Sequence, residues 1–283
     1  MSDAGETAAR QTGPAPGQTP LRPAAAPRRF KTPRTIGALV LREMQTTYGR
    51  SPGGYAWALL EPIGGIALLT LILVSGFRVR EPALGSNFQL FFASGLLVLI
   101  MFQSISGRLA QSIAFSRNLL FYPGVKYTDA LIARFLLNLL TQTLVFLIIV
   151  TGIIVLFDVQ TIVDPVPILA GLGLTALLAL GIGTLNCFLV NVVPIWDPIW
   201  SILTRPLILV STVFYTFEQI PRQYQDIGWW NPLVHLVGMM RQGLYPSYDA
   251  YWVTPLYPAT LGTVTLVFGL LFLHRFHRDI LNR

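Results

Sequence analysis

Long apolar runs dominate the chain, and short polar stretches separate them. The hydrocarbon core of a bilayer is about 30 Å thick, so a helix needs roughly 20 apolar residues to cross it. Six runs reach or approach that length: Tyr55 to Phe77, Phe88 to Gly107, Asp129 to Phe157, Val166 to Val190, Pro198 to Phe217 and Leu256 to Leu273. The pattern predicts an all-α integral membrane protein with six transmembrane helices.

One further apolar stretch, from Ile227 to Tyr245, contains polar residues and a proline. Asn231, Pro232, His235 and Arg241 fall within it. Interrupted helices are tolerated at membrane depth only where protein or a cavity surrounds the freed backbone groups. We therefore expect a re-entrant helical segment, or a pair of interfacial helices, between the fifth and sixth spans.

Two different segments precede the first span. Residues 1–33 are rich in Ala, Pro, Gly and Thr and have no aromatic residue before Phe30, so they cannot bury enough surface to fold. From Arg34 to Arg50, apolar residues recur at helical spacing opposite polar ones. These patterns predict a disordered cytoplasmic tail (1–33), an amphipathic interfacial helix (34–54) and a transmembrane domain (55–283).

The composition is typical of a membrane protein and unlike that of a soluble protein. Hydrophobic residues make up 53% of the chain and charged residues only 12%, whereas soluble domains carry about 25% charged residues. The tail, the amphipathic helix, the loop after the second span and the C-terminus together hold fourteen of the 20 Lys and Arg residues. Cytoplasmic loops carry such an excess. Both termini are therefore predicted to be cytoplasmic, which requires an even number of spans.

The residues that catalysis or metal binding would need are missing or scattered. The two lysines, Lys31 and Lys126, follow Phe30 and Val125, so the chain has no Gly-Lys pair and no Walker A loop. Three histidines are dispersed without a zinc-protease or hydrolase pattern, and Cys187 is the single cysteine. We expect no catalytic residue, no metal site and no cofactor in this chain.

Three charged residues fall inside predicted spans: Glu61, Arg134 and Arg205. Each lies five to seven residues beyond the cytoplasmic start of its run, or roughly 8 to 11 Å deep at about 1.5 Å per residue. An unpaired charge is costly at that depth. We predict an ion pair between Glu61 and one of the two arginines, with the other arginine facing a channel. The alternative is that each arginine extends its side chain to the headgroups.

A sequence signature lies at the start of the first span. The stretch LREMQTTYGRSPGGYAWALLEP, Leu41 to Pro62, combines an Arg-Glu pair, a Tyr, a Ser, a Gly, a Trp and a Glu-Pro at set spacing. It resembles the N-terminal signature of ABC-2 type polysaccharide export permeases, most of all capsule exporters of the KpsM/BexB kind. Asn231-Pro232-Leu233 and Arg241 are similar to a later family element. The resemblance covers about Arg34 to Arg283.

This resemblance implies a function that composition does not give. It implies a homodimer in the bacterial inner membrane, docked on a separate cytoplasmic ATPase that binds ATP-Mg, exporting a lipid-linked capsular polysaccharide to the periplasm. It also implies a periplasmic co-polymerase and an outer-membrane conduit as partners. The alternatives are a permease for another glycan, such as O-antigen or teichoic acid, and, from a different class, a membrane-embedded enzyme or anchor subunit.

The resemblance also suggests where the ATPase binds. Arg42 and Glu43 belong to the signature, and Arg108 to Thr128 resembles the coupling helix of the family. Within it, Phe115, Asn118 and Leu119 are expected to contact the ATPase. The alternative for this segment is an ordinary loop on lipid headgroups.

Aromatic residues are dense on the predicted periplasmic side. They form either the interfacial belt of most membrane proteins or a lining on which sugar rings stack during transport. We expect the translocation path at Tyr215, Phe217, Trp229 and Trp230.

Overall fold

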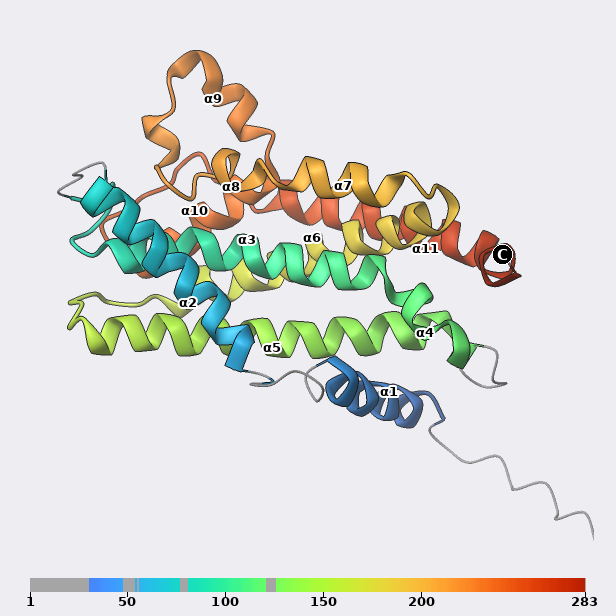
Figure 1. Ribbon diagram of the computed structural model, residues 1–283. Coiled ribbons are helices and arrows are strands. Elements are labelled where there is room, and N and C mark those ends of the chain that lie inside the picture. The colour runs from blue at the N-terminus through green and yellow to red at the C-terminus, as the bar shows by residue number, and fades with distance from the viewer. Residues whose placement is uncertain (1–30, 48–53, 55, 77–80, 121–125, 283) are drawn as a thin grey trace, which may run out of the picture. The chain divides into compact units, whose positions relative to one another are not determined.

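The computed structural model describes residues 31–47, 54, 56–76, 81–120 and 126–282 (Figure 1). These residues are helical or irregular, with no strand among them. The helices are α1 (Lys31–Thr47), α2 (Ala56–Leu71) with its π-helical end η1 (Ile72–Gly76), α3 (Phe88–Ala110), α4 (Ser112–Leu120), α5 (Tyr127–Leu156), α6 (Pro165–Val192), α7 (Trp196–Thr204), α8 (Leu207–Val210), the 3₁₀ turn η2 (Phe217–Gln219), α9 (Arg222–Trp229), α10 (Pro232–Leu244) and α11 (Leu256–Asn282).

Within the described ranges, five helices are long and apolar enough to cross a membrane. They are Ala56–Gly76, Phe88–Ala110, Tyr127–Leu156, Pro165–Val192 and Leu256–His277. Each coincides with one of the predicted runs to within a few residues, and Leu256–Asn282 continues well past the predicted end of the last one. The all-helical membrane class is confirmed.

The sixth predicted run, Pro198 to Phe217, is not one long helix. Proline has no backbone N–H to donate, and at Arg205 and Pro206 the run divides into α7 and α8, although both residues keep right-handed helical dihedral angles. Helix α8 ends at Val210, and two residues later Thr212 has a left-handed φ of 54°. Helical residues therefore extend only from Trp196 to Val210, about 22 Å at 1.5 Å per residue.

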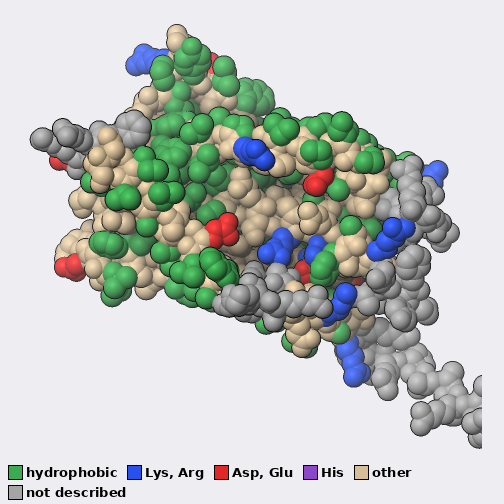
Figure 2. Space-filling view, viewed as in Figure 1, with side chains coloured by type: hydrophobic (Ala, Val, Ile, Leu, Met, Phe, Trp, Pro, Cys, Tyr) green, Lys and Arg blue, Asp and Glu red, His purple; other side chains and the backbone are tan. Residues whose placement is uncertain are grey.

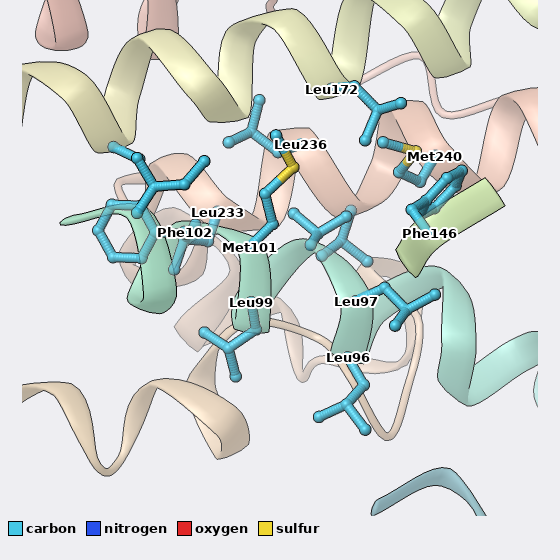
Figure 3. Close-up of a cluster of buried hydrophobic side chains, with 14 of the residues drawn as sticks. Leu96, Leu97, Leu99, Met101, Phe102, Phe146, Leu172, Leu233, Leu236 and Met240 are labelled. Carbon is cyan, nitrogen blue, oxygen red and sulfur yellow. The ribbon is translucent and has the colours of Figure 1, made fainter. Parts of the chain in front are cut away.

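Helix α3 lies at the centre of the bundle, where it packs against α2, α5, α6 and α10. Its side chains are buried on almost every side, including Leu90, Met101 and Ile105. Figure 3 shows residues of α3, α5, α6 and α10 in one apolar cluster, among them Leu97 and Met240. In a membrane such burial does not come from water exclusion alone, because lipid is also apolar, and close van der Waals packing supplies much of the stability.

Helices α6 and α11 approach each other closely through glycine. A Cβ on Gly181 would collide with the carbonyl oxygen of Gly262 and the hydroxyl of Thr265, and a Cβ on Gly269 would meet the backbone of α6. Small residues at such crossings allow two membrane helices to pack backbone against backbone. These glycines therefore hold α6 and α11 together by direct backbone contact.

The stretch predicted to be re-entrant, Ile227 to Tyr245, forms the end of α9 and the whole of α10. Its polar residues do not break α10: Asn231 caps it by accepting a hydrogen bond from the Leu233 N–H at 3.1 Å, and His235 and Arg241 are buried within it. Figure 1 shows α9 standing out from the bundle. How this segment lies relative to the membrane stays a prediction.

The predicted amphipathic helix, 34–54, corresponds to α1, which begins at Lys31. Residues 48–53 lie outside the described part of the chain, as do residues 1–30 of the predicted disordered tail. The apolar residues of α1 are divided between two sides, since Leu41 and Met44 are exposed while Ile36 and Val40 are half-buried. Its amphipathic, interfacial role stays a prediction.

Candidate functional site: a polar face along a central helix

Two cavities with both polar and apolar side chains in their walls flank α3. The first, which we call the α2 cavity, has a volume of about 540 Å³; the second, the α7 cavity, has about 630 Å³. Both are bordered by Ile100, Gln103 and Gly107 of α3 and by Gln111, the residue that follows α3. The α2 cavity adds Trp57, Ala58, Glu61, Pro62, Ser104, Arg108, Arg134 and Gln142. The α7 cavity adds Leu96, Leu99, Ser106, Asp197, Trp200, Ser201, Thr204, Arg205 and Ile208.

The two cavities have similar chemistry: each contains a tryptophan, a carboxylate and at least one arginine, and they share Gln103 and Gln111. Hydrogen bonds connect the walls, since Gln103 Nε2 donates to the Thr204 carbonyl at 3.2 Å and Gln142 Nε2 donates to Ser104 Oγ at 3.0 Å. A Cβ on Gly107 would meet no atom within 4 Å, so this part of α3 is open. We call the strip formed by both cavities the polar face.

The polar face lies on membrane helices, and this constrains its surroundings. Figure 2 shows a hollowed area of non-hydrophobic surface here, with charged side chains around it and hydrophobic side chains beyond. Exposed carboxylates, guanidinium groups and amides are expensive in contact with lipid tails and are found instead facing water-filled cavities or protein. The arrangement therefore indicates that this strip of polar side chains faces water or the polar surface of another protein chain.

A second polar cluster joins four helices near the point where α3 ends and α5 begins. Arg134 Nε of α5 donates to Glu43 Oε1 of α1 at 2.9 Å, and both side chains are buried. Arg134 Nη1 donates to the Arg108 carbonyl at 2.8 Å. The Arg134 guanidinium also lies 4.2 Å from the ring centroid of Phe115 of α4, within the range of a cation–π contact. We call these residues the Arg134 cluster.

Arg134, one of the two arginines predicted to pair with Glu61, pairs with a different carboxylate. Arg134 pairs with Glu43, and no ion pair of Glu61 with Arg134 or Arg205 is found in the described part of the chain. Instead, Glu61 and Arg134 line the α2 cavity, and Arg205 lines the α7 cavity. Residue depths within the spans could not predict this partner, because the carboxylate of Glu43 comes from α1, which lies outside the predicted spans.

The five residues predicted to contact an ATPase are differently placed. Glu43 is 5% exposed and directed to Arg134, whereas Phe115 is 39% exposed. The guanidinium of Arg42 lies 5.6 Å from the Phe115 ring. The side chains of Asn118 and Leu119 lie outside the described residues. Sequence spacing contained a signal for Glu43, because it falls four residues after Leu39 and seven after Ile36, on the side of α1 that packs inward.

The four predicted path aromatics line neither the α2 cavity nor the α7 cavity. Phe217 is 7% exposed and stacks on Trp252 with ring centroids 4.3 Å apart. Trp229 stacks on Tyr257 at 5.2 Å, Tyr215 donates its hydroxyl to the Leu209 carbonyl at 2.8 Å, and Trp230 is 68% exposed. Of these four side chains, only that of Trp230 has most of its surface exposed.

These aromatics form a hydrogen-bonded assembly around α9 and α10. His235 accepts from the Thr254 N–H through Nδ1 at 3.1 Å, which leaves Nε2 to donate to the Trp229 carbonyl at 2.9 Å. Glu218 accepts from Tyr248 Oη at 3.0 Å and from Trp252 Nε1 at 2.8 Å. Burial, and next the nearby Glu218 charge, raise the pKa of Tyr248. The assembly is a structural unit, and its role in transport stays a prediction.

A metal ion has no evident place in this arrangement. In the part of the chain that the structure describes, no three His, Cys, Asp or Glu residues lie close enough together to hold one.

The chain is similar in sequence to known membrane transport proteins. The family described as ABC-2 type transporter matches residues 34–245. The polysialic acid transport protein KpsM of Escherichia coli is 32% identical over 83% of this chain and 91% of its own length. The capsule polysaccharide export inner-membrane proteins CtrC of Neisseria meningitidis and BexB of Haemophilus influenzae are 27% and 24% identical, each over 87% of this chain and 92% of their own length.

Proposed function

Because this chain belongs to the ABC-2 type transporter family, we propose that it is the permease that carries lipid-linked capsular polysaccharide from the cytoplasm to the periplasm. The chain is a membrane subunit of a transporter and not an enzyme, and ATP hydrolysis belongs to a separate subunit. The names of its relatives support a capsular polysaccharide as cargo and the inner membrane as location.

The polar face is the observation that carries this proposal. A polysaccharide needs a wide path with hydrogen-bonding groups and no deep apolar barrier, and the polar face supplies amides, hydroxyls and two tryptophans over membrane helices. One copy leaves this face open. In a homodimer, two such faces opposite each other would enclose the path and remove the cost of exposing polar side chains to lipid.

The proposed topology has both termini in the cytoplasm and six crossings. The α7–α8 segment would make the fifth crossing, shortened by the break at Arg205 and Pro206. Its helical length of about 22 Å, with the irregular residues that follow, approaches the hydrocarbon thickness of about 30 Å. The α9–α10 segment would then be the re-entrant element on the periplasmic side.

The ATPase would dock where α1 and α4 meet. Arg42 and Phe115 lie side by side there, and Arg134 connects both helices to the wall of the α2 cavity. A movement imposed on α4 would reach that wall through few intermediates. The remaining partners, a periplasmic co-polymerase and an outer-membrane conduit, rest on the family resemblance.

Deletion of the gene in its host tests the proposed function. We expect the glycan to disappear from the cell surface and accumulate inside the cell, where antibody labelling of intact and permeabilised cells distinguishes the two. Complementation with the wild-type chain should restore export. Accumulation of a different glycan would favour the O-antigen or teichoic acid alternative. Loss of glycan synthesis without accumulation would favour an enzyme or anchor subunit and would contradict the proposal.

A further inference from the structure

The α7–α8 segment forms one wall of the polar face, but it is only loosely packed on the rest of the bundle. None of the side chains from Trp196 to Val210 is buried, in contrast to α3, which lies beside them. Ile202 and Leu203 are 64% and 54% exposed. Pro206 has no N–H to donate to the carbonyl of Ile202, so the backbone hydrogen bonds do not continue through the break. The position of α7 therefore depends strongly on its hydrogen bonds to other helices.

Two such hydrogen bonds hold α7, one at each end. At its start, Trp196 Nε1 donates to Asn186 Oδ1 of α6 at 2.9 Å. At its end, Gln103 Nε2 of α3 donates to the carbonyl of Thr204 at 3.2 Å. A broken helix at membrane depth needs donors and acceptors from its neighbours, because lipid supplies none. Gln103 provides such a donor directly before the break.

The contact at the start of α7 is incomplete. Asn186 is 2% exposed, and its Nδ2 has no hydrogen-bond partner among the described residues. A buried donor without an acceptor is unfavourable. Asn186 therefore holds α7 less effectively than a fully hydrogen-bonded amide would, and the contact of Gln103 with the end of α7 becomes the more important of the two.

Gln103 also has a particular place in the polar face, because it lines both the α2 cavity and the α7 cavity. The next residue, Ser104, accepts a hydrogen bond from Gln142 of α5 at 3.0 Å. Two successive residues of α3 therefore connect it to α7 and to α5. Gln111 lines both cavities too, but no hydrogen bond from its side chain to α7 is found in the described part of the chain.

We propose that Gln103 is a positioning residue of the polar face: its amide holds α7 against α3, and without this amide α7 moves outward and the α7 cavity widens. The inference rests on the proposed function, since it takes the polar face as the path of the cargo. It adds the contact that sets the width of this path. A glycan hydroxyl can accept a hydrogen bond from Gln103 in place of the Thr204 carbonyl, so the cargo itself would release α7 as it passes.

A buried cysteine behind α7 reports this movement. Ser106 of α3 lines the α7 cavity but is only 1% exposed. In a Cys187→Ser background, Ser106→Cys should therefore react slowly with a water-soluble pyridyl disulfide, and faster when α7 moves away. The rate is measured by mass spectrometry on the purified full chain in phosphatidylcholine vesicles. Gln103→Met, which removes the amide at similar length, should raise it about fivefold, as expected for the loss of one neutral hydrogen bond.

Two matched controls accompany this measurement. Gln111→Met removes the other amide that lines both cavities, and it should leave the rate of Ser106→Cys unchanged. Ala176→Cys is a second buried reporter, on α6 and outside both cavities. Its rate should not respond to Gln103→Met, because only a general loosening of the bundle would expose it.

Gln103→Glu separates the hydrogen bond from simple packing. Glutamate is close to glutamine in size, but its ionised carboxylate cannot donate to the Thr204 carbonyl, whereas the protonated form can. The rate of Ser106→Cys, divided by the rate of the chain with Gln103 at the same pH, should be raised at about pH 8, where the introduced carboxyl is ionised. It should return towards one as this carboxyl is protonated. The other charged groups around both cavities are present in both chains, so the ratio cancels their titration. For Gln103→Met the ratio should not depend on pH.

Four results would each overturn the proposal: an unchanged rate in Gln103→Met, an equal rise in Gln111→Met, an equal rise at Ala176→Cys, or a Gln103→Glu ratio that does not change with pH. All these rates are measured without cargo and without the ATPase, whereas the deletion strain tests the proposed function. A failure in the vesicles would therefore reject the role of Gln103 and leave the proposed function intact.

Discussion

At the scale of single residues, Arg134 has the most consequential position. A buried guanidinium requires both a counter-charge and acceptors for its other N–H groups. Glu43 supplies the charge, and the carbonyl of Arg108 accepts a further hydrogen bond. The ring of Phe115 covers the guanidinium face. One side chain therefore connects α1, α3, α4 and α5.

The ion pair is expected to be strongly coupled. Arg134→Met or Glu43→Gln alone leaves a buried charge without a partner and should lower the free energy of unfolding by about 3–5 kcal/mol. The double variant should lose clearly less than the sum of the two. A double-mutant cycle on the purified chain, followed by denaturant unfolding, measures this coupling.

Arg42→Ala is the control for this cycle, since Arg42 is the neighbour of Glu43 on α1 and takes no part in the ion pair. It should lose less than about 1 kcal/mol. Additive losses for Glu43 and Arg134 would show that the pair does not act as a unit.

At the scale of elements, the turn after α8 depends on a residue of α10. Thr212 has a left-handed φ of 54°, a conformation that costs a non-glycine residue about 1–3 kcal/mol. Arg241, only 1% exposed, donates to the carbonyls of Thr212 at 2.6 Å and Tyr215 at 2.8 Å. Its guanidinium lies 4.4 Å from the ring centroid of Phe91 on α3. Arg241 thus holds the chain where it leaves α8 and turns towards α9.

Replacing Arg241 by lysine should release this turn. Lysine keeps the charge but lacks the planar fork that reaches two carbonyls at once, and each carbonyl left unsatisfied costs about 1–3 kcal/mol. We expect Arg241→Lys to lower the midpoint of thermal unfolding and to expose the 211–216 segment to limited proteolysis. Arg222→Lys, the same change on exposed α9, should do neither. A stable Arg241→Lys variant with an unchanged cleavage pattern would contradict the assigned role.

At the scale of the whole molecule, the number of crossings decides on which side of the membrane the C-terminal end of α11 lies. Among the described residues, five helices are long enough to cross the membrane. If the short α7–α8 segment crosses as well, the number of crossings is six; if it does not, the number is five. The two possibilities place the C-terminal end of α11 on opposite sides of the membrane.

Single-cysteine labelling distinguishes them. Cys187 is buried and is the only cysteine of the chain, so Cys187→Ser gives a background without thiols. In cells with a permeabilised outer membrane, Asp249→Cys should react with an impermeant maleimide. Lys126→Cys and Arg275→Cys should react only after the inner membrane is disrupted. Labelling of Arg275→Cys from outside, without Lys126→Cys, would show an odd number of crossings and refute the six-span topology.

The sequence by itself determined the membrane class, five of the long helices and the family signature. The reason is that lipid cannot satisfy backbone or charged groups, so every crossing must appear as a local apolar run. The signature from Leu41 to Pro62 is likewise local in the chain. Both can be identified without knowing which helices are neighbours.

Only the tertiary structure decided which polar residues meet. Glu43 and Arg134 are 91 residues apart, and no periodicity in either helix indicates that α1 packs against α5. The polar face was missed for the same reason. Gln103 and Gln142 stand singly in two different apolar runs, and they form one surface with Gln111 only when α2, α3, α5 and α7 lie together. The break between α7 and α8 was missed because hydropathy counts apolar residues and does not detect the missing N–H of Pro206.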